Sequence, residues 1–221
     1  MSQREATVQG EVHAAESDKQ ALLERGLEEY DAVLVEGRSP TLVVRELTVG
    51  YAAFLMGYVT LMWLQAVVAR TRAKLAGGTS LRAAVEAAGV DYHDRIDADT
   101  ATVYEMVPRW GKYLIGGWLV GALALSVVVG VNRVVLVVFA LSVPYLYATF
   151  SVVLVAVAGG GRAAHMADRI TTVADQRAYD RVAVLCGDSH REAIREELED
   201  REWSVTTHPS SHPLVRLLGG T

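Results

Sequence analysis

A long apolar stretch near the middle of the chain constrains its fold more than any other feature. Residues 113–132 contain no charged side chain, and after the single Arg133 no charge follows until Arg162. A helix needs about 20 predominantly apolar residues to span a bilayer, so this stretch is long enough to cross twice. The sequence therefore predicts a transmembrane helical hairpin over residues 112–160. Small residues at Gly117 and Gly121 suit helix association and predict a homo-oligomer through this hairpin.

The charges around the hairpin predict its orientation. Arg109, Lys112 and Arg162 flank its outer ends, whereas Arg133 alone lies at its tip. Since basic residues concentrate on the cytoplasmic side, we expect a multi-pass protein of the cell membrane with its soluble domain in the cytoplasm. The N-terminus has no basic region followed by an apolar core, so no cleavable signal is expected. A net charge of −5 without a basic stripe argues against nucleic acid as a partner.

The first 36 residues have the pattern of a strand–helix–strand unit. Residues 6–13 read as a short strand and 14–30 as a helix, and AVLVEG after Asp31 is a continuous apolar run typical of a buried strand. Such a unit predicts two parallel, neighbouring strands. We expect an α/β fold in which a largely parallel sheet is flanked by helices and interrupted by the hairpin. The expected divisions are 1–111, 112–160 and 161–221.

Further elements follow the same logic. VDYHDRI (90–96) and RVAVLCG (181–187) are expected to be strands, and WSVTT (203–207) an additional edge strand. Ser80 is placed to cap a helix, and residues 99–110 predict a helix that ends at Pro108. Residues 162–177 and the charged segment REAIREELEDREW are expected to be helical.

A second uncharged segment, residues 47–69, could span a membrane by length alone. Gly50, Gly57 and its hydroxyl and amide side chains fit a buried or interfacial helix nearly as well. A sheet cannot be completed through lipid, so an even number of crossings must separate its strands. We therefore expect this helix to pack on the sheet, near the membrane surface, and only the later pair to span.

Two segments share one design, in which an apolar strand runs into Gly-x-x-His and then a helix rich in acids. They are TVQGEVH, with Gly10 and His13, and VAVLCGDSH, with Gly187 and His190. The carboxyl ends of parallel strands form the ligand-binding edge of an α/β sheet, and AVLVEG delivers Glu36 there. The glycines let the backbone pass closely beneath a ligand. Two imidazoles and a carboxylate suit zinc, manganese, cobalt or ferrous iron.

Each of these signals has a plain structural alternative. A single Gly-x-x-His turn is common by chance, and a histidine after a strand is more often a structural residue than a ligand. Cys186 has two readings, a buried thiol on the strand or a thiolate ligand. His208 and His212 could add ligands, but a loosely packed tail is the expectation for this segment.

The same elements, in the same order, resemble the TraB/Tiki family. QGEVHAAESDKQALLERGLEEYDAVLVEGR resembles the opening of these proteins, RAAHMADRI their arginine- and methionine-containing helix, and VAVLCGDSH their closing turn. This resemblance implies kinship with metal-dependent hydrolases, some of whose animal members are metalloproteases. It further implies that His13, Glu36 and His190 are the metal or catalytic residues. Polar partners of the site are implied at three arginines, Arg38, Arg95 and Arg162.

The leading hypothesis is therefore a membrane-anchored, metal-dependent hydrolase that acts on a peptide or a small molecule. His13, Glu36 and His190 would hold the ion, Mn, Zn or Co, and Glu11 or Asp188 would act as general base. The alternative is a non-catalytic, membrane-bound binding or regulatory module that keeps the fold without the chemistry.

Overall fold

The computed structural model describes residues 3–12, 16–38, 48–76, 80–129, 145, 148–149, 152–153 and 161–212. It divides into two compact units. The first unit comprises Met1–Ser39, Thr71–Ala98 and Ala158–Thr221, and the second comprises Pro40–Arg70 and Asp99–Val157. Each unit is thus built from segments that are distant in the sequence.

A five-stranded parallel sheet forms the centre of the first unit. Its strands lie in the order β3-β2-β4-β1-β5, and every neighbouring pair is parallel. The bounds are β1 (Glu5–Glu11), β2 (Ala32–Val35), β3 (Asp91–His93), β4 (Arg181–Gly187) and β5 (Ser204–His208). The predicted α/β class with a parallel sheet flanked by helices is confirmed, as are the short strand after residue 90 and the additional edge strand near residue 205.

The expectation that the first two strands are neighbours is wrong. They are parallel, but β4 lies between them and pairs with both. The composition of β4 gives the reason, because its five residues 182–186 are all buried and all apolar. A strand that is apolar on both faces is most stable in the centre of a sheet, where helices cover both sides.

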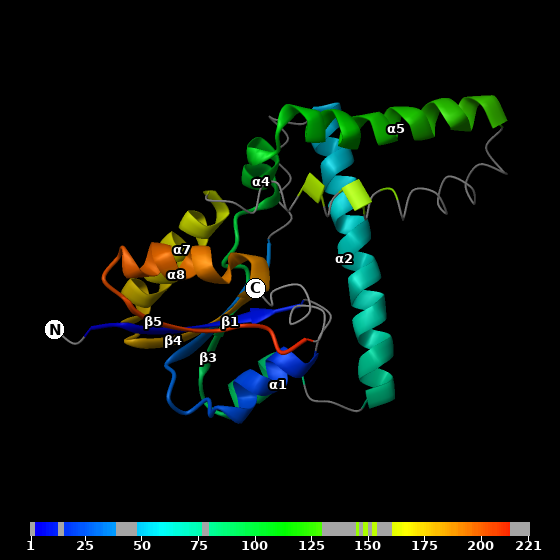
Figure 1. Cartoon of the computed structure of the whole chain (residues 1–221). Coiled ribbons are helices and arrows are strands. Elements are labelled where there is room, and N and C mark those ends of the chain that lie inside the picture. The colour runs from blue at the N-terminus through cyan, green and yellow to red at the C-terminus, as the bar shows by residue number, and fades with distance from the viewer. Residues whose placement is uncertain are drawn as a thin grey trace. The chain divides into compact units, whose positions relative to one another are not determined.

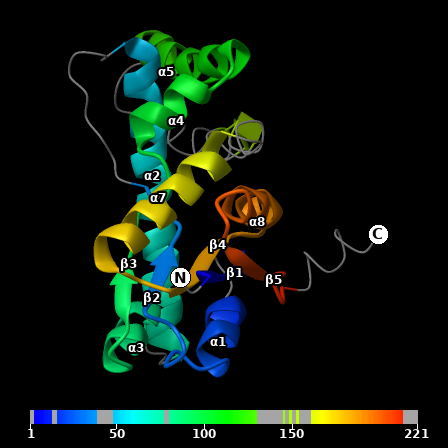
Figure 2. The ribbon, with the colours of Figure 1, turned by 90° about the vertical axis from the view of Figure 1, so that its left-hand side faces the viewer.

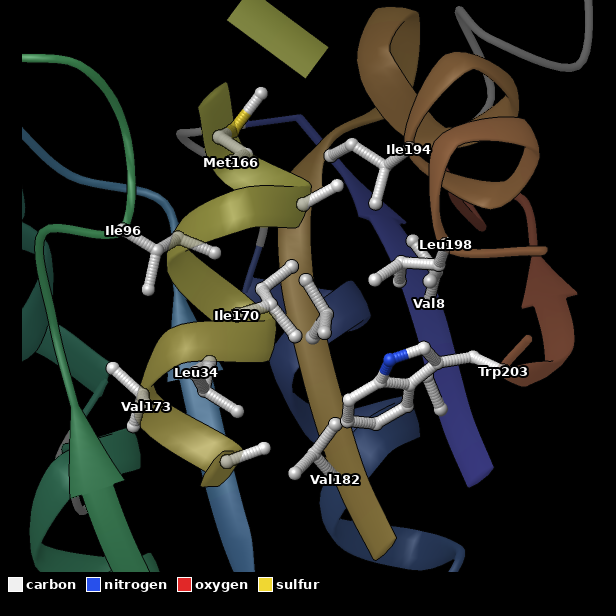
Figure 3. Packing of buried hydrophobic residues seen from close by; sticks show 14 of the residues in the cluster. Val8, Leu34, Ile96, Met166, Ile170, Val173, Val182, Ile194, Leu198 and Trp203 are labelled. Atoms are coloured by element: carbon white, nitrogen blue, oxygen red, sulfur yellow. The ribbon is translucent and has the colours of Figure 1, made fainter. Parts of the chain in front are cut away.

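Side chains of β4 alternate between the two faces of the sheet. Val182, Val184 and Cys186 belong to a core with α7 (Gly161–Arg177) and α8 (Arg191–Glu199), and Figure 3 shows its packing. Ala183 and Leu185 face the second core, with α1 (Glu16–Glu24) and α3 (Leu81–Ala87). Figure 1 shows α7 and α8 on one side of the sheet and α1 on the other, and Figure 2 gives the perpendicular view. The sheet unit is therefore a three-layer sandwich.

The predicted helix cap at Ser80 is confirmed, since its hydroxyl accepts a hydrogen bond from the backbone N–H of Ala83 at 3.3 Å. Helix α7 also forms where the sequence predicted one. Helix α1 is shorter than expected because the chain leaves it near Gly26, which adopts a φ of 91°. Glycine reaches this left-handed conformation without strain, so it suits the end of a helix.

Three helices make up most of the described part of the second unit. They are α2 (Val49–Ala76), α4 (Thr100–Met106) and α5 (Arg109–Val129), and the part of α2 after residue 70 belongs to the first unit. The rings of Tyr51 and Phe54 stack with centroids 6.5 Å apart, and Tyr104 lies 5.3 and 5.4 Å from them. Pro108 separates α4 from α5, as the sequence predicted.

Among the described residues, no helix has both the length and the apolar character needed to cross a membrane. Residues 113–129 of the predicted hairpin lie in α5, whereas most of its second arm lies outside the described residues. The packing of the 47–69 segment on the sheet stays a prediction, because residues 49–70 of helix α2 belong to the second unit.

Candidate functional site

Polar side chains gather where β2, β3 and β4 end. Glu36 directly follows β2, Asp97 follows β3 by four residues, and His190 closes a 3₁₀ turn (Asp188–His190) after β4. Because the three strands are parallel neighbours, their carboxyl ends lie at one edge of the sheet. Arg162, in the first turn of α7, completes the group.

Arg162 links two carboxylates in the interior. Its Nη2 donates to Glu36 Oε1 at 2.8 Å and to Asp97 Oδ2 at 2.6 Å, and its Nε donates to Asp97 Oδ1 at 3.2 Å. The residue is only 1% exposed. A buried guanidinium needs such partners, because a charge removed from water without compensation costs several kcal/mol. The planar donors of arginine suit this double contact, which lysine could not reproduce.

Asp97 and Glu36 have further partners of their own. Arg38 Nε donates to Asp97 Oδ2 at 2.5 Å, and the backbone N–H of Ala98 donates to Asp97 Oδ1 at 2.8 Å. The second oxygen of Glu36, Oε2, accepts the N–H of Gly187 at 2.6 Å. Glu36 thereby joins the loop after β2 to the Gly-x-x-His turn after β4.

His190 has a ring nitrogen that makes no described hydrogen bond. Its Nδ1 is buried and has no hydrogen-bond partner among the described residues. Its Nε2 lies 3.9 Å from Glu36 Oε1, which is too long for a hydrogen bond. An unsatisfied buried nitrogen costs about 1–3 kcal/mol, so a group that bonded it would stabilise the site.

Burial and charge fix the protonation states. Burial lowers the pKa of His190, and the Arg162 guanidinium lowers it further, so the ring is neutral at physiological pH. Burial alone would raise the pKa of Asp97, but Arg38 and Arg162 outweigh it and hold this pKa below its usual value. Two guanidinium groups thus balance two carboxylates, and a neutral imidazole lies beside them.

A second polar cluster supports the two turns. Asp18, on α1, is fully buried and accepts the N–H of Val12 at 3.1 Å, the hydroxyl of Ser210 at 2.6 Å and both the N–H and hydroxyl of Ser211 at 2.7 Å. The N–H of Ser210 donates to Asp188 Oδ1 at 2.9 Å. The segment after β5 therefore connects both Gly-x-x-His turns, and the expectation of a loosely packed tail is wrong for residues 209–212.

The two glycines of the turns have different structural roles. A Cβ at Gly10 would lie 2.1 Å from Asp188 Oδ1, so this glycine makes room for the side chain of the opposite turn. Gly187 contributes its N–H to Glu36 instead. Neither appears among the described positive-φ residues, so the reason for glycine at position 10 is close approach and not conformational freedom.

The structure brings some predicted site residues together and leaves others apart. Glu36, Arg38, Arg162 and His190 lie in the group just described. The side chain of Arg95 is 59% exposed and pairs at 4.0 Å with Asp94, so the described contacts do not bring it to the site. Three further candidates, Glu11, Asp188 and His13, have separate outcomes.

Glu11 ends β1 opposite Gly187 in the strand register and is buried. Asp188 bonds Ser210 and lies 3.4 Å from Arg191 Nε, so its carboxylate is occupied in holding the turn. His13 lies outside the described residues. Of the two interpretations of Cys186, the fold supports a buried thiol on the strand, since the thiol is free and buried, and burial raises its pKa.

Asp97 is the residue that sequence reasoning missed. A signal was present, because Asp97 follows a predicted strand at the edge that carries Glu36. The nearby Asp91, Asp94 and Asp99 obscured it, since all four aspartates look alike in a polar loop. Only burial distinguishes them: Asp97 is 5% exposed, and no other of the four is buried.

Among the described residues, no three His, Cys, Asp or Glu side chains are arranged to hold a metal ion. Two of the three predicted ligands, Glu36 and His190, are adjacent, and the third lies outside this part of the chain. No family model matches the sequence, and neither a curated protein nor a solved structure matches it.

Proposed function

We propose that this chain is a membrane-anchored α/β protein of the TraB/Tiki type that uses a divalent metal ion, Mn, Zn or Co, to hydrolyse a peptide bond or a small molecule. The observation that supports this most is His190, a buried imidazole whose Nδ1 has no partner among the described residues and whose Nε2 lies 3.9 Å from Oε1 of Glu36. Neutral imidazole and carboxylate are the ligands that such ions take in hydrolases.

The ligand atoms at this edge of the sheet, an imidazole nitrogen and two carboxylate oxygens, are of the types that divalent metal ions bind. The 3.9 Å between His190 Nε2 and Glu36 Oε1 is slightly wider than the roughly 3.4 Å that separates two ligands of one tetrahedral zinc. Each oxygen of Glu36 accepts one described hydrogen bond and keeps a further lone pair. His13 would supply the third ligand, and the pairing of Glu11 with Gly187 supports this, because it starts the two turns side by side.

The residues of the chain would prepare the site in distinct ways. The hydrogen bond from Arg162 holds Glu36 in place, and burial lowers the pKa of His190, so its neutral ring presents a lone pair at neutral pH. A bound divalent ion would lower the pKa of a coordinated water to about 7. Of the two proposed general bases we favour Glu11, since Asp188 is already bonded to the backbone of Ser210.

The membrane anchor is the hairpin over residues 112–160, with the soluble parts in the cytoplasm. The strand pairing supports an even number of crossings here, because β3 and β4, which precede and follow this segment, belong to one sheet. Two uncharged arms meet that requirement. A homo-oligomer would form through the same hairpin, around Gly117 and Gly121.

Elemental analysis of the purified full-length protein tests the metal site. We expect close to one equivalent of a transition metal in the wild type and a large loss in His190→Gln and Glu36→Gln. His165→Gln is the matched control, since His165 is exposed on α7, and it should keep the metal. Metal-free wild type, or metal unchanged in His190→Gln, would reject the proposal.

One observation favours the non-catalytic alternative, a binding or regulatory module. The charges of Arg38, Arg162, Glu36 and Asp97 cancel one another without any added ion. In that case the group would serve the stability of the fold. Protein that purifies without metal and hydrolyses neither peptide nor ester substrates would select this alternative.

A further inference from the structure

The exposed apolar side chains are confined to one unit of the molecule. Every large hydrophobic residue that the structure describes as exposed belongs to the second unit, and none to the sheet unit. They are Val49, Met56, Val59, Met62, Trp63, Val67, Trp110, Tyr113, Leu114, Val120, Tyr145 and Val152. Scattered apolar residues are normal on a protein surface, but such a concentration indicates a face that something covers.

Helix α2 carries much of this surface and has two apolar faces. Met56, Val59, Trp63 and Val67 recur at intervals of three and four residues, so they lie along one side of the helix. The other side, with residues 51, 54 and 58, is buried within its own unit. A surface helix of a water-soluble protein usually has polar residues on its outer side, whereas the residues of α2 described as exposed between positions 49 and 67 are all apolar.

The polar group within this exposed surface is already satisfied. The hydroxyl of Thr60 donates to the backbone carbonyl of Met56 at 2.8 Å, so it does not depend on water. Such internal bonding is what a hydroxyl needs when its surroundings offer no hydrogen-bond partner. The exposed side of α2 is thus suited to contact with an apolar medium.

The strand pairing forbids α2 to cross a membrane. β2 pairs with β3 from Ala32↔Asp91 to Leu34↔His93, so the segment between them begins and ends on one side. With 28 residues, α2 is long enough to span, at about 42 Å by the rise of an α-helix. Apart from α2, the part of this segment in the second unit is residues 40–48, which are too few for a second crossing. The number of crossings must be even and cannot be two, so it is zero.

We propose that α2 lies against the surface of a bilayer that contains anionic lipids, with Met56, Val59, Trp63 and Val67 in contact with lipid, and does not cross it. This inference rests on the membrane anchor proposed above. Charge favours this occupant over a second protein, because Arg70, Arg72 and Lys74 follow the apolar run in the sequence and match anionic headgroups. Tryptophan is also the side chain most enriched at this interface.

Nitroxide labels on single cysteines test the contact in full-length protein reconstituted into vesicles of phosphatidylcholine and phosphatidylglycerol. Val59→Cys and Met62→Cys report on α2, Val120→Cys on the hairpin, and Glu24→Cys on the exposed surface of α1; the native Cys186 is buried. We expect labels at 59 and 62 to collide with oxygen more than with a water-soluble nickel chelate, as at 120. The label at 24 should show the reverse.

The outcomes separate this inference from the anchor itself. Water-like behaviour at 59 and 62 with lipid-like behaviour at 120 would overturn the role of α2 and leave the hairpin in place. Spin–spin broadening at 59 and 62 would mean that a second copy covers the face, which also overturns it. Water-like behaviour at 120 would reject the anchor.

Sidedness tests the absence of a crossing. Thr48→Cys and Thr71→Cys place thiols near the two ends of α2, and both positions are exposed. In sealed vesicles, a membrane-impermeant maleimide should label both from the same side as Glu24→Cys. Labelling of the two thiols from opposite sides would show that α2 spans the bilayer and would overturn the proposal.

Discussion

The two units of this protein treat polar and apolar side chains in opposite ways. The sheet unit buries ionised groups, with Asp18, Asp97 and Arg162 all at most 5% exposed, and its described part exposes no large hydrophobic residue. The second unit buries no charged side chain among those described, and its buried polar atoms include the hydroxyls of Thr100, Thr149 and Tyr51; it exposes twelve large hydrophobic side chains. The first unit is organised around an internal polar group. The described surface of the second unit is rich in apolar side chains, which is the basis of the proposed contact with lipid.

Removing the guanidinium of Arg162 should have the largest effect. In Arg162→Met two buried carboxylates lose their shared partner, so we expect a loss of about 3–5 kcal/mol in the free energy of unfolding. Arg82→Met is the control, because Arg82 and its partner Glu86 are both more than half exposed; it should leave the free energy of unfolding almost unchanged. Denaturant titration of both variants measures the difference. Similar losses in the two would mean that the buried network does not hold the sheet unit.

The two tryptophans in contrasting surroundings sharpen the comparison. Trp203 is 3% exposed in the core of the sheet unit, with the Arg4 guanidinium 5.6 Å from its ring centroid, whereas Trp63 is 58% exposed on α2. Trp203→Ala should cost about 3 kcal/mol or more, since it opens a large cavity.

Trp63→Ala should leave the free energy of unfolding in detergent within about 0.5 kcal/mol, because the side chain is exposed. Thermal denaturation of the two variants in one detergent compares them. A cost at Trp63 equal to that at Trp203 would mean that protein, and not lipid or detergent, covers this face of α2.

Replacing either of two glycines by alanine should change the stability by a smaller amount, with opposite signs at the two positions. Gly10→Ala places a methyl group against Asp188, which must move and give up its bond to Ser210, at a cost of about 1–3 kcal/mol. A methyl group at Gly117 on α5 would meet no described atom within 4 Å outside its own helix backbone, so in the single chain, without the proposed oligomer contact, Gly117→Ala should stabilise the helix by up to about 1 kcal/mol. Denaturant midpoints measure both. A loss of stability in Gly117→Ala would indicate a second helix packed closely on this glycine.

The smallest of these effects should be the loss of stability of the sheet unit when acid protonates Asp18. Burial opposes ionisation of Asp18, but hydrogen bonds from Ser210, Ser211 and Val12 hold its pKa below the usual value. Its contribution is therefore complete above the unfolded pKa of about 4 and is lost as the pH falls through the lower folded pKa. In Asp18→Asn the loss of stability between pH 5 and 3 should be smaller than in the wild type, by on the order of 1 kcal/mol. Identical pH profiles in denaturant titrations would contradict this role.

The elements of the fold were largely predictable, because each depends on neighbouring residues. Apolar runs mark β2 and β4, and hydrogen bonding by Ser80 or the ring of Pro108 marks a helix boundary. Strand order was not predictable in this way. The insertion of β4 between β1 and β2 depends on contacts between residues about 150 positions apart, for which a local pattern carries no signal.

The sequence by itself determined that Glu36 and His190 follow apolar strands, and that residues 47–69, 113–132 and 134–161 form three charge-free stretches. Only the tertiary structure decided that Glu36 and Asp97 meet at Arg162, because a buried guanidinium needs partners and here they come from two segments distant in the sequence. It also decided that the segment holding α2 begins and ends at the same sheet, since β2 and β3 pair with each other. On the proposed membrane anchor, this pairing excludes a single crossing of the bilayer by that segment.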